Sequence, residues 1–437
     1  MPSLWWGHTF IASFNLTAMQ ISTFHVLLIG LCGSLYSERL PVFSTSVGTQ
    51  SIGVRYTFTE EDGLVESAKQ IQALGSDTLK IAVTPKYHDD YMFERDPSID
   101  SMLELVETNP SYFEVMDMPF RNIMLWIYPF SDHYSAFYKG SIPKNEAQAI
   151  YDEIYNFTSM LLKRYSGSGK SFFLGNWEGD WHVMREHYDY NADPAPEAIK
   201  GAIEWFNLRE KAVADARRDT AHEDVEVYFY IELNHVAKAM DDDRPTIVNR
   251  VLPHIRTDYV SWSSYDVTKP AAMMSYEDGR KRVLDALDYI EKHLPPSDVP
   301  GKRVFVGEYG FEVVNFRNPE TQNNYTTAIM KWALEWGCPF ILYWELYCNE
   351  IDSKTGKHRG YWLIDDTGEK QPIYHLHKSF LDKANSFVDA YKKEHGALPN
   401  QEVFNRIATE WIQPYTAFEI RADTDSVIRA AITHPHE

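Results

Sequence analysis

The sequence predicts an α/β fold in which eight parallel strands and the helices between them form a (β/α)8 TIM barrel. Short runs rich in Ile, Val, Leu, Phe and Tyr alternate with amphipathic helical stretches from about residue 51 onward. The segments after these runs are long and polar, whereas the turns that lead into them are short. The chain of 437 residues also has the length of one barrel with long βα loops.

The runs predicted as strands are almost continuously apolar, as expected of strands covered on both faces. They span Ser51–Tyr56, Leu79–Thr84, Asn122–Tyr128, Ser171–Gly175, Glu226–Glu232, Tyr259–Trp262, Arg303–Val306 and Pro339–Trp344. Between them, residues 64–74 and 284–294 keep one apolar stripe at helical spacing. Gly75 and Gly337 follow helical stretches where a C-terminal cap is expected, which predicts short turns into the next strands.

The long polar segments would lie at the C-terminal ends of the strands, where a barrel of this type builds its active site. They are Lys86–Asp100, Ser131–Lys144, Gly179–Pro196 and Tyr347–Gly360. A doubly wound open sheet is the alternative fold, but no Gly-x-Gly-x-x-Gly or Walker sequence follows the first run. We therefore expect a catalytic barrel over residues 48–395 and a short C-terminal helical extension over residues 396–437 that packs on it.

Composition restricts the partners. The formal net charge of −21 would repel phosphate backbones and anionic lipid headgroups, so nucleic acid and membrane surfaces are not expected to bind. Neutral or cationic substrates fit this charge better. Aromatic residues make up 14% of the chain and supply either flat faces for sugar rings or a large aromatic core.

Residues 1–37 are predicted to be a signal peptide, which implies a secreted or periplasmic protein. An apolar run over residues 24–31 is followed by the small residues Ser34 and Ser37. The segment lacks the usual basic start, and Met19 would begin a more conventional signal. A buried strand or an anchor is the other interpretation, although the run is short for a membrane-spanning helix, and we expect no membrane insertion of the mature chain.

No metal or cofactor is expected. Cys338 and Cys348 flank an apolar strand whose extended length of roughly 30 Å exceeds the reach of a disulfide, which predicts free thiols. The acidic residues 241–243 and the pair at 132–133 fit neither an EF-hand loop nor a zinc-binding spacing. No Gly-x-Ser-x-Gly sequence suggests a serine esterase.

Two glutamates stand at the ends of predicted strands. Glu178 follows the fourth run and Glu308 follows the seventh, and each lies among aromatic residues and next to glycine. Glycoside hydrolysis needs one carboxyl group to protonate the departing oxygen and a second to attack the anomeric carbon or activate water. Either glutamate alone would more often be a helix cap or a surface ion pair, but together, at opposed barrel positions, they favour catalysis.

The chain resembles the large clan of retaining glycoside hydrolases with a (β/α)8 barrel, which includes cellulases, mannanases and β-galactosidases. The sequences that carry the resemblance are Gly307-Glu308-Tyr309-Gly310, Tyr343-Trp344-Glu345 and, after the last strand, Gly360-Tyr361-Trp362-Leu363-Ile364-Asp365 with Lys370-Gln371-Pro372. The resemblance implies that Glu178 is the acid/base and Glu308 the nucleophile. It assigns no particular family within the clan.

One feature departs from the clan. Its members place Asn directly before the acid/base, whereas here Trp177 separates Asn176 from Glu178. Either Asn176 reaches the sugar through a bulge, or Asp180 shares or takes the role of the acid. We expect Glu178 to be the acid in preference to Asp180.

The resemblance also implies a tyrosine and a cation beside the nucleophile. Tyr265, after the sixth run, is the candidate to hydrogen-bond Glu308. Arg55 is the first candidate for the cation, with an ordinary structural ion pair as the alternative for Arg55. Clan members more often carry the cation on the second strand, where this chain has Lys80 and Lys86.

Three tryptophans near strand ends are candidates to stack on pyranose rings, namely Trp344, Trp126 and Trp177. For Trp126 a place in the core is an equal alternative. Asn234 and His235 end the fifth run and are candidates to contact sugar hydroxyls, although a lone histidine is more often structural.

The sequence thus predicts a secreted enzyme that cleaves a β-glycosidic bond in an oligo- or polysaccharide by retaining double displacement. Two alternatives remain. One is an inverting glycosidase on the same fold, whose carboxyl groups would be roughly 6.5–9.5 Å apart instead of roughly 5–5.5 Å. The other is a carbohydrate-binding barrel without turnover. The oligomeric state and the sugar are not predicted.

Overall fold

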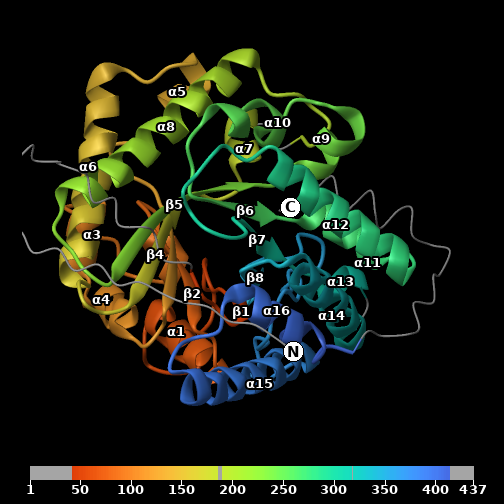
Figure 1. The fold of residues 1–437 in the computed structure, drawn as a ribbon. Helices are drawn as coiled ribbons and strands as arrows, with labels where there is room; N and C mark the ends of the chain where they lie inside the picture. Colours follow the sequence, from red (N-terminus) through yellow and green to blue (C-terminus); the bar gives the residue numbers. More distant parts are fainter. Residues whose placement is uncertain (1–41, 186–188, 317, 414–437) are drawn as a thin grey trace, which may run out of the picture. The chain divides into compact units, whose positions relative to one another are not determined.

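The computed structural model describes residues 42–185, 189–316 and 318–413, and within them eight parallel strands (Figure 1). The strands are β1 (Ser46–Thr49), β2 (Thr78–Val83), β3 (Asn122–Ile127), β4 (Lys170–Gly175), β5 (Val225–Leu233), β6 (Tyr259–Ser263), β7 (Val304–Tyr309) and β8 (Phe340–Tyr343). Their order in the sheet is β1-β8-β7-β6-β5-β4-β3-β2. β1 and β2 are the two ends of this order, and Ser44 Oγ, just before β1, lies 3.3 Å from Thr78 Oγ1 at the start of β2. The sheet is therefore nearly closed. The predicted (β/α)8 barrel is confirmed.

Seven of the eight strands lie where the sequence predicted them, but the first prediction is wrong. The first strand, β1, spans Ser46–Thr49, and the predicted run Ser51–Tyr56 lies after it in the chain. β1 is short and built from small residues around Val47, and it lacks the apolar density of the other strands. In the following segment the amides of Gly53 and Val54 donate to the Asp90 carbonyl after β2, so that segment lies at the C-terminal mouth of the barrel.

Helices alternate with the strands and surround them (Figure 1). They are α1 (Gly63–Leu74), α2 (Tyr87–Tyr91), α3 (Met102–Thr108), α4 (Pro110–Asp117), α5 (Ser135–Lys139), α6 (Lys144–Arg164), α7 (Gly179–Met184), α8 (Pro196–Asp219), α9 (Val236–Asp242), α10 (Ile247–Arg250), the 3₁₀ helix η1 (Leu252–His254), α11 (Tyr265–Ala272), α12 (Tyr276–Lys292), α13 (Val313–Phe316), α14 (Pro319–Trp336), α15 (Pro372–His395) and α16 (Gln401–Thr409). The predicted caps are present, because α1 ends at Gly75 with φ 102° and α14 ends at Gly337 with φ 99°.

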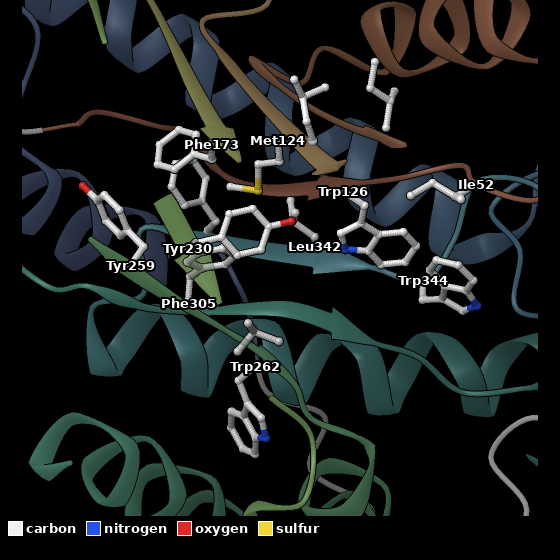
Figure 2. Packing of buried hydrophobic residues seen from close by; sticks show 14 of the residues in the cluster. Ile52, Met124, Trp126, Phe173, Tyr230, Tyr259, Trp262, Phe305, Leu342 and Trp344 are labelled. Atoms are coloured by element: carbon white, nitrogen blue, oxygen red, sulfur yellow. The ribbon is translucent and has the colours of Figure 1, made fainter. Parts of the chain in front are cut away.

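Aromatic side chains fill the interior of the barrel (Figure 2). Phe173 of β4 lies at the centre of this packing, with ring centroids 5.1 Å from Tyr228, 5.3 Å from Tyr259 and 5.2 Å from Phe340. Each of these four residues is exposed by 1% or less. Much of the aromatic content therefore packs the core and makes the floor beneath the strand ends rigid.

Residues 396–413, within the predicted extension, contact the end of the barrel where the strands begin. In α16, the Asn405 side chain donates to the Cys338 carbonyl at 2.9 Å and accepts from Ser46 Oγ at 2.8 Å. Cys338 and Cys348 are buried free thiols, as predicted. None of the helices that the structure describes combines the length and the apolar composition needed to cross a membrane. The predicted signal peptide lies outside the described residues.

Candidate active site

Four ionisable side chains from four strands meet at the C-terminal end of the barrel. Glu308 lies in β7, Glu232 in β5 and Lys80 in β2, and Glu178 follows β4 at the start of α7. Each is exposed by 1% or less. Buried charges are stable only when they are paired, so their mutual contacts define the site.

Glu308 is held by a cation and a phenol. Lys80 Nζ lies 3.5 Å from its Oε1, and the Tyr265 hydroxyl donates to its Oε2 at 3.4 Å. Burial raises the pKa of Glu308 above the ordinary value for glutamate, and the negative charges of Glu232 and Glu178 raise it further, whereas Lys80 lowers it. This carboxyl group therefore takes up a proton more readily than an exposed one.

Glu178 is fixed through both its backbone and its side chain. Its backbone has φ 20° and ψ 76°, and its amide donates to Glu232 Oε1 at 3.2 Å. Ser263 Oγ donates to its Oε1, and Asn234 Nδ2 lies 3.5 Å from its Oε2. Ser263 is also the residue of β6 that pairs with Glu308 in β7. One serine thus connects the two candidate catalytic residues.

Glu232 links the two sides of the cluster. Its Oε1 accepts from the Glu178 amide, and its Oε2 accepts from Lys80 Nζ at 2.9 Å and from Ser261 Oγ at 2.7 Å. Lys80 Nζ also donates to the Gly307 carbonyl at 3.2 Å. Every oxygen of this buried carboxyl group therefore has a donor.

Gly307 allows this packing. The register between β6 and β7 shifts so that Trp262 pairs with Val306 and Ser263 with Glu308, which leaves Gly307 as the extra residue of a bulge. A Cβ atom on Gly307 would lie 1.8 Å from Ser261 Oγ. Only glycine fits between the nucleophile candidate and the charged residues beneath it.

Two of the predicted site residues brace the loop after β4. Asn176 is fully buried, and its amide group donates to the Trp177 and Glu232 carbonyls and accepts from the Glu232 amide. Asp180 accepts backbone N–H bonds on both oxygens, from Asn234, His235 and Ile247 at 2.8–3.2 Å. The structure thus gives both side chains backbone partners, and a sugar contact of Asn176 or an acid role of Asp180 stays a prediction.

Of the three candidates for the cation beside Glu308, the structure brings Lys80 close to it. Arg55 is exposed, and so is Lys86. Lys80, the alternative on the second strand, makes the contact. The sequence could not separate these residues, because the direction in which a side chain points depends on where its strand begins.

Aromatic rings border the cluster. The Trp126 and Trp344 rings lie side by side at one end of the packing in Figure 2, with centroids 6.1 Å apart and planes tilted by 32°. Lys80 Nζ lies 4.4 Å from the Trp126 centroid. Each ring is 6% exposed, while Trp177 is exposed to an intermediate degree. Trp344 Nε1 donates to Glu350 at 3.2 Å, so its ring is held in place.

His235 packs between rings. Its centroid lies 4.3 Å from that of Trp181 and 4.8 Å from that of Tyr190. Burial lowers the pKa of His235 to about 4, so the ring is neutral near neutral pH. This position favours the structural interpretation over a sugar contact, whereas Asn234 remains beside Glu178.

Sequence reasoning missed Glu232 and Ser263. Glu232 carried a signal, because a charged residue inside a continuous apolar strand needs a buried partner, and Lys80 in β2 carried the same signal. Ser263 gave none, since serine is common at strand ends.

Comparisons with known proteins show the fold. No protein-family model matches the chain, and no curated protein does. Among solved structures, an exo-β-1,4-mannosidase from Opitutaceae bacterium strain TAV5 aligns with a TM-score of 0.51 and 12% identity, over 79% of this chain and 60% of the mannosidase. This chain thus spans less than two thirds of that protein.

Two further structures align at lower scores. An endo-1,4-β-xylanase of Penicillium canescens has a TM-score of 0.46 and 14% identity over 77% of this chain and 94% of its own. A family 39 glycoside hydrolase of Bacteroides cellulosilyticus WH2 has a TM-score of 0.46 and 10% identity over 77% and 63%. The mannosidase, with its TM-score of 0.51 at 12% identity, supports the barrel fold alone, and function has to be argued from the site.

Proposed function

We propose that this protein is a glycosidase that cleaves a β-glycosidic bond in an oligo- or polysaccharide with retention of configuration. The observation that carries the proposal is the pair of buried carboxyl groups after β4 and in β7, connected by Ser263, with Lys80 and Tyr265 beside Glu308. Such a pair at the mouth of a (β/α)8 barrel has the components that glycoside hydrolysis needs. The glycosidases among similar structures are consistent with it.

The two glutamates have different environments, which supports different roles. Glu308 has an ammonium group within 3.5 Å, whereas Ser263 and Asn234 beside Glu178 are neutral donors. A neighbouring cation stabilises the carboxylate form. We therefore assign Glu308 as the nucleophile and Glu178 as the acid/base.

In the first step Glu308 attacks the anomeric carbon while Glu178 gives its proton to the departing glycosidic oxygen. The bond to the leaving group breaks, and a glycosyl ester on Glu308 forms. In the second step Glu178, now a carboxylate, takes a proton from water as the water oxygen attacks the anomeric carbon. The ester breaks, and both carboxyl groups return to their initial states. Trp344 and Trp126 would offer their edges and faces to the sugar.

The test is hydrolysis of a panel of plant, fungal and algal polysaccharides and aryl glycosides by the wild type, Glu178→Ala and Glu308→Ala. Asp258→Asn is a matched control. Asp258 is a buried carboxylate outside the cluster, and its Oδ2 lies 2.7 Å from Arg217 Nη1. We expect both alanine variants to lose activity and the control to keep it. Activity that survives in Glu308→Ala would disprove the assignment.

The anomer formed first distinguishes the mechanisms. Proton NMR of the product within the first turnovers would show the β-anomer for retention, and an α-anomer would favour an inverting enzyme. Sugar binding without hydrolysis across the panel would favour a binding barrel.

We also propose that the protein is secreted. The apolar run over residues 24–31 supports this, and sequencing the N-terminus of the exported protein tests it.

A further inference from the structure

We propose that Glu232 is a positioning residue of this reaction, because one of its oxygens fixes the backbone of Glu178 and the other holds Lys80 against Glu308. The inference rests on the proposed glycosidase function. It assigns a role to a residue that lies below the reacting carboxyl groups and does not reach the substrate.

The contacts give Glu232 this place. Its side chain is 0% exposed, so no substrate can touch it. Its Oε1 is 3.2 Å from the Glu178 amide, directly at the residue with the strained backbone. Its Oε2 is 2.9 Å from Lys80 Nζ, which is closer than the 3.5 Å between Lys80 and Glu308. One carboxylate thus restrains both catalytic residues.

Glu232 also divides the charge of Lys80 between two carboxylates. In the part of the chain that the structure describes, the ionisable groups around Glu308 include Lys80 from β2, Glu178 after β4, Glu232 from β5 and Tyr265 after β6. The charge of Glu308 in turn raises the pKa of Tyr230 in β5 and of Glu345 after β8. After burial, the charge of Glu232 does most to raise the pKa of Glu308. Because Lys80 is shared, Glu308 keeps more affinity for a proton, and more nucleophilic strength, than it would beside an undivided cation.

The first test is the pH dependence of kcat/KM in Glu232→Gln. Its acid limb reports the ionisation of the nucleophile in the free enzyme. We expect the limb to move to lower pH, because a negative charge is removed and Lys80 turns to Glu308 alone. Ser261→Ala, which removes the hydroxyl bond to Glu232 Oε2, should move the limb to higher pH, because Glu232 then depends more on Lys80. Asp258→Asn should leave the limb in place.

Opposite shifts in these two variants are the signature of charge sharing, since a role limited to packing would lower activity without moving the limb. If Glu232→Gln is not recovered as a folded protein, Ser261→Ala provides the same test with all charges retained. An acid limb that stays in place in the recovered variants would overturn the proposal.

A second test needs no substrate. Chemical unfolding of the wild type, Glu232→Gln, Glu308→Gln and the double variant forms a cycle that measures the coupling of the two carboxyl groups. A raised pKa means that folded Glu308 holds its proton where the unfolded chain has lost it, so this contribution to stability falls as pH rises above about 4.3, the ordinary value for glutamate.

Replacing Glu308 should therefore become less costly as pH rises, and this trend should flatten in the Glu232→Gln background. An additive cycle at all pH values would overturn the role of Glu232. A coupled cycle without hydrolysis of any glycan would overturn the glycosidase function alone, so the two failures can be distinguished.

Discussion

Lys80→Met is the substitution that tests the electrostatics of the site most directly. The ammonium group is fully buried, lies 2.9 Å from Glu232 and 3.5 Å from Glu308, and also donates to the Gly307 carbonyl. Methionine preserves the length and the apolar stem of the side chain but removes the charge. Two buried carboxyl groups then lose their common cation.

The magnitude follows from the burial of all three groups. Removing one partner of a buried ion pair costs about 3–5 kcal/mol, which is a large part of the stability of a typical domain. The cost should depend on pH. The loss of the cation raises the pKa of Glu308 further, so the variant can hold protons on its carboxyl groups and lose less stability at about pH 5 than at about pH 8. The acid limb of kcat/KM should move to higher pH, with little activity left on its acid side.

The assay is denaturant unfolding at both pH values, together with the pH profile of hydrolysis. Lys170→Met is the matched control, because Lys170 begins β4 at the opposite end of the barrel and donates to the Met118 and Phe120 carbonyls at 2.6 and 2.8 Å. Its loss should cost about 1–3 kcal/mol with little dependence on pH and no shift of the limb. Equal, pH-independent losses in both variants would refute the electrostatic reasoning.

Three further predictions follow from single contacts. Tyr265→Phe removes the 3.4 Å hydrogen bond to Glu308, so kcat/KM should fall by up to about tenfold, corresponding to about 0.5–1.5 kcal/mol, and the acid limb of its pH profile should move to higher pH. An unchanged pH profile would show that Tyr265 does not act on Glu308. Trp344→Phe keeps an aromatic ring but removes the buried indole N–H that donates to Glu350, so KM for a long oligosaccharide should rise by a few fold to about tenfold and the free energy of unfolding should fall by about 1–3 kcal/mol; steady-state kinetics and denaturant unfolding measure the two effects, and an unaltered KM would argue against stacking. Asp180→Asn places an amide where both oxygens now accept backbone N–H bonds, so stability should fall by about 1–3 kcal/mol while the basic limb of the pH profile stays in place; a lost basic limb in thermal-stable protein would return Asp180 to the role of acid.

The fold could be predicted from the sequence where apolar density was high. β3 and β8 are nearly continuous runs of large apolar residues, and β5, β6 and β7 are rich in them between a few polar positions, as burial on both faces requires. β1 could not be found in this way, because it is built from small residues: a Cβ atom on Gly48 would lie only 3.0 Å from Leu342 Cδ2, so the strand has little room for a larger side chain there. Tertiary packing, and not local propensity, makes Ser46–Thr49 a strand.

The site was predictable in its two glutamates and less so in their partners. Glu178 and Glu308 could be placed because strand ends converge in any such barrel. The contacts of Asn176 and Asp180 with β5 and its following loop could not be predicted, because they depend on the irregular backbone at Glu178, which no sequence pattern encodes. Arg55 was misplaced for a related reason, since its run follows the strand instead of forming it.

The balance of charge in the cluster is consistent with the acid and the nucleophile that we propose. The cluster holds three buried carboxyl groups, Glu178, Glu232 and Glu308, and two of them, Glu232 and Glu308, contact the ammonium group of Lys80. Burial opposes the accumulation of uncompensated negative charge, so the cluster favours retention of a proton, and interacting groups of this kind titrate as a unit. The contacts differ between the two proposed catalytic residues. Lys80 and Tyr265 lie beside Glu308, and Glu232 draws part of the charge of Lys80 away from it, whereas the donors beside Glu178 are the neutral side chains of Ser263 and Asn234. This difference supports the roles that we propose for the two glutamates.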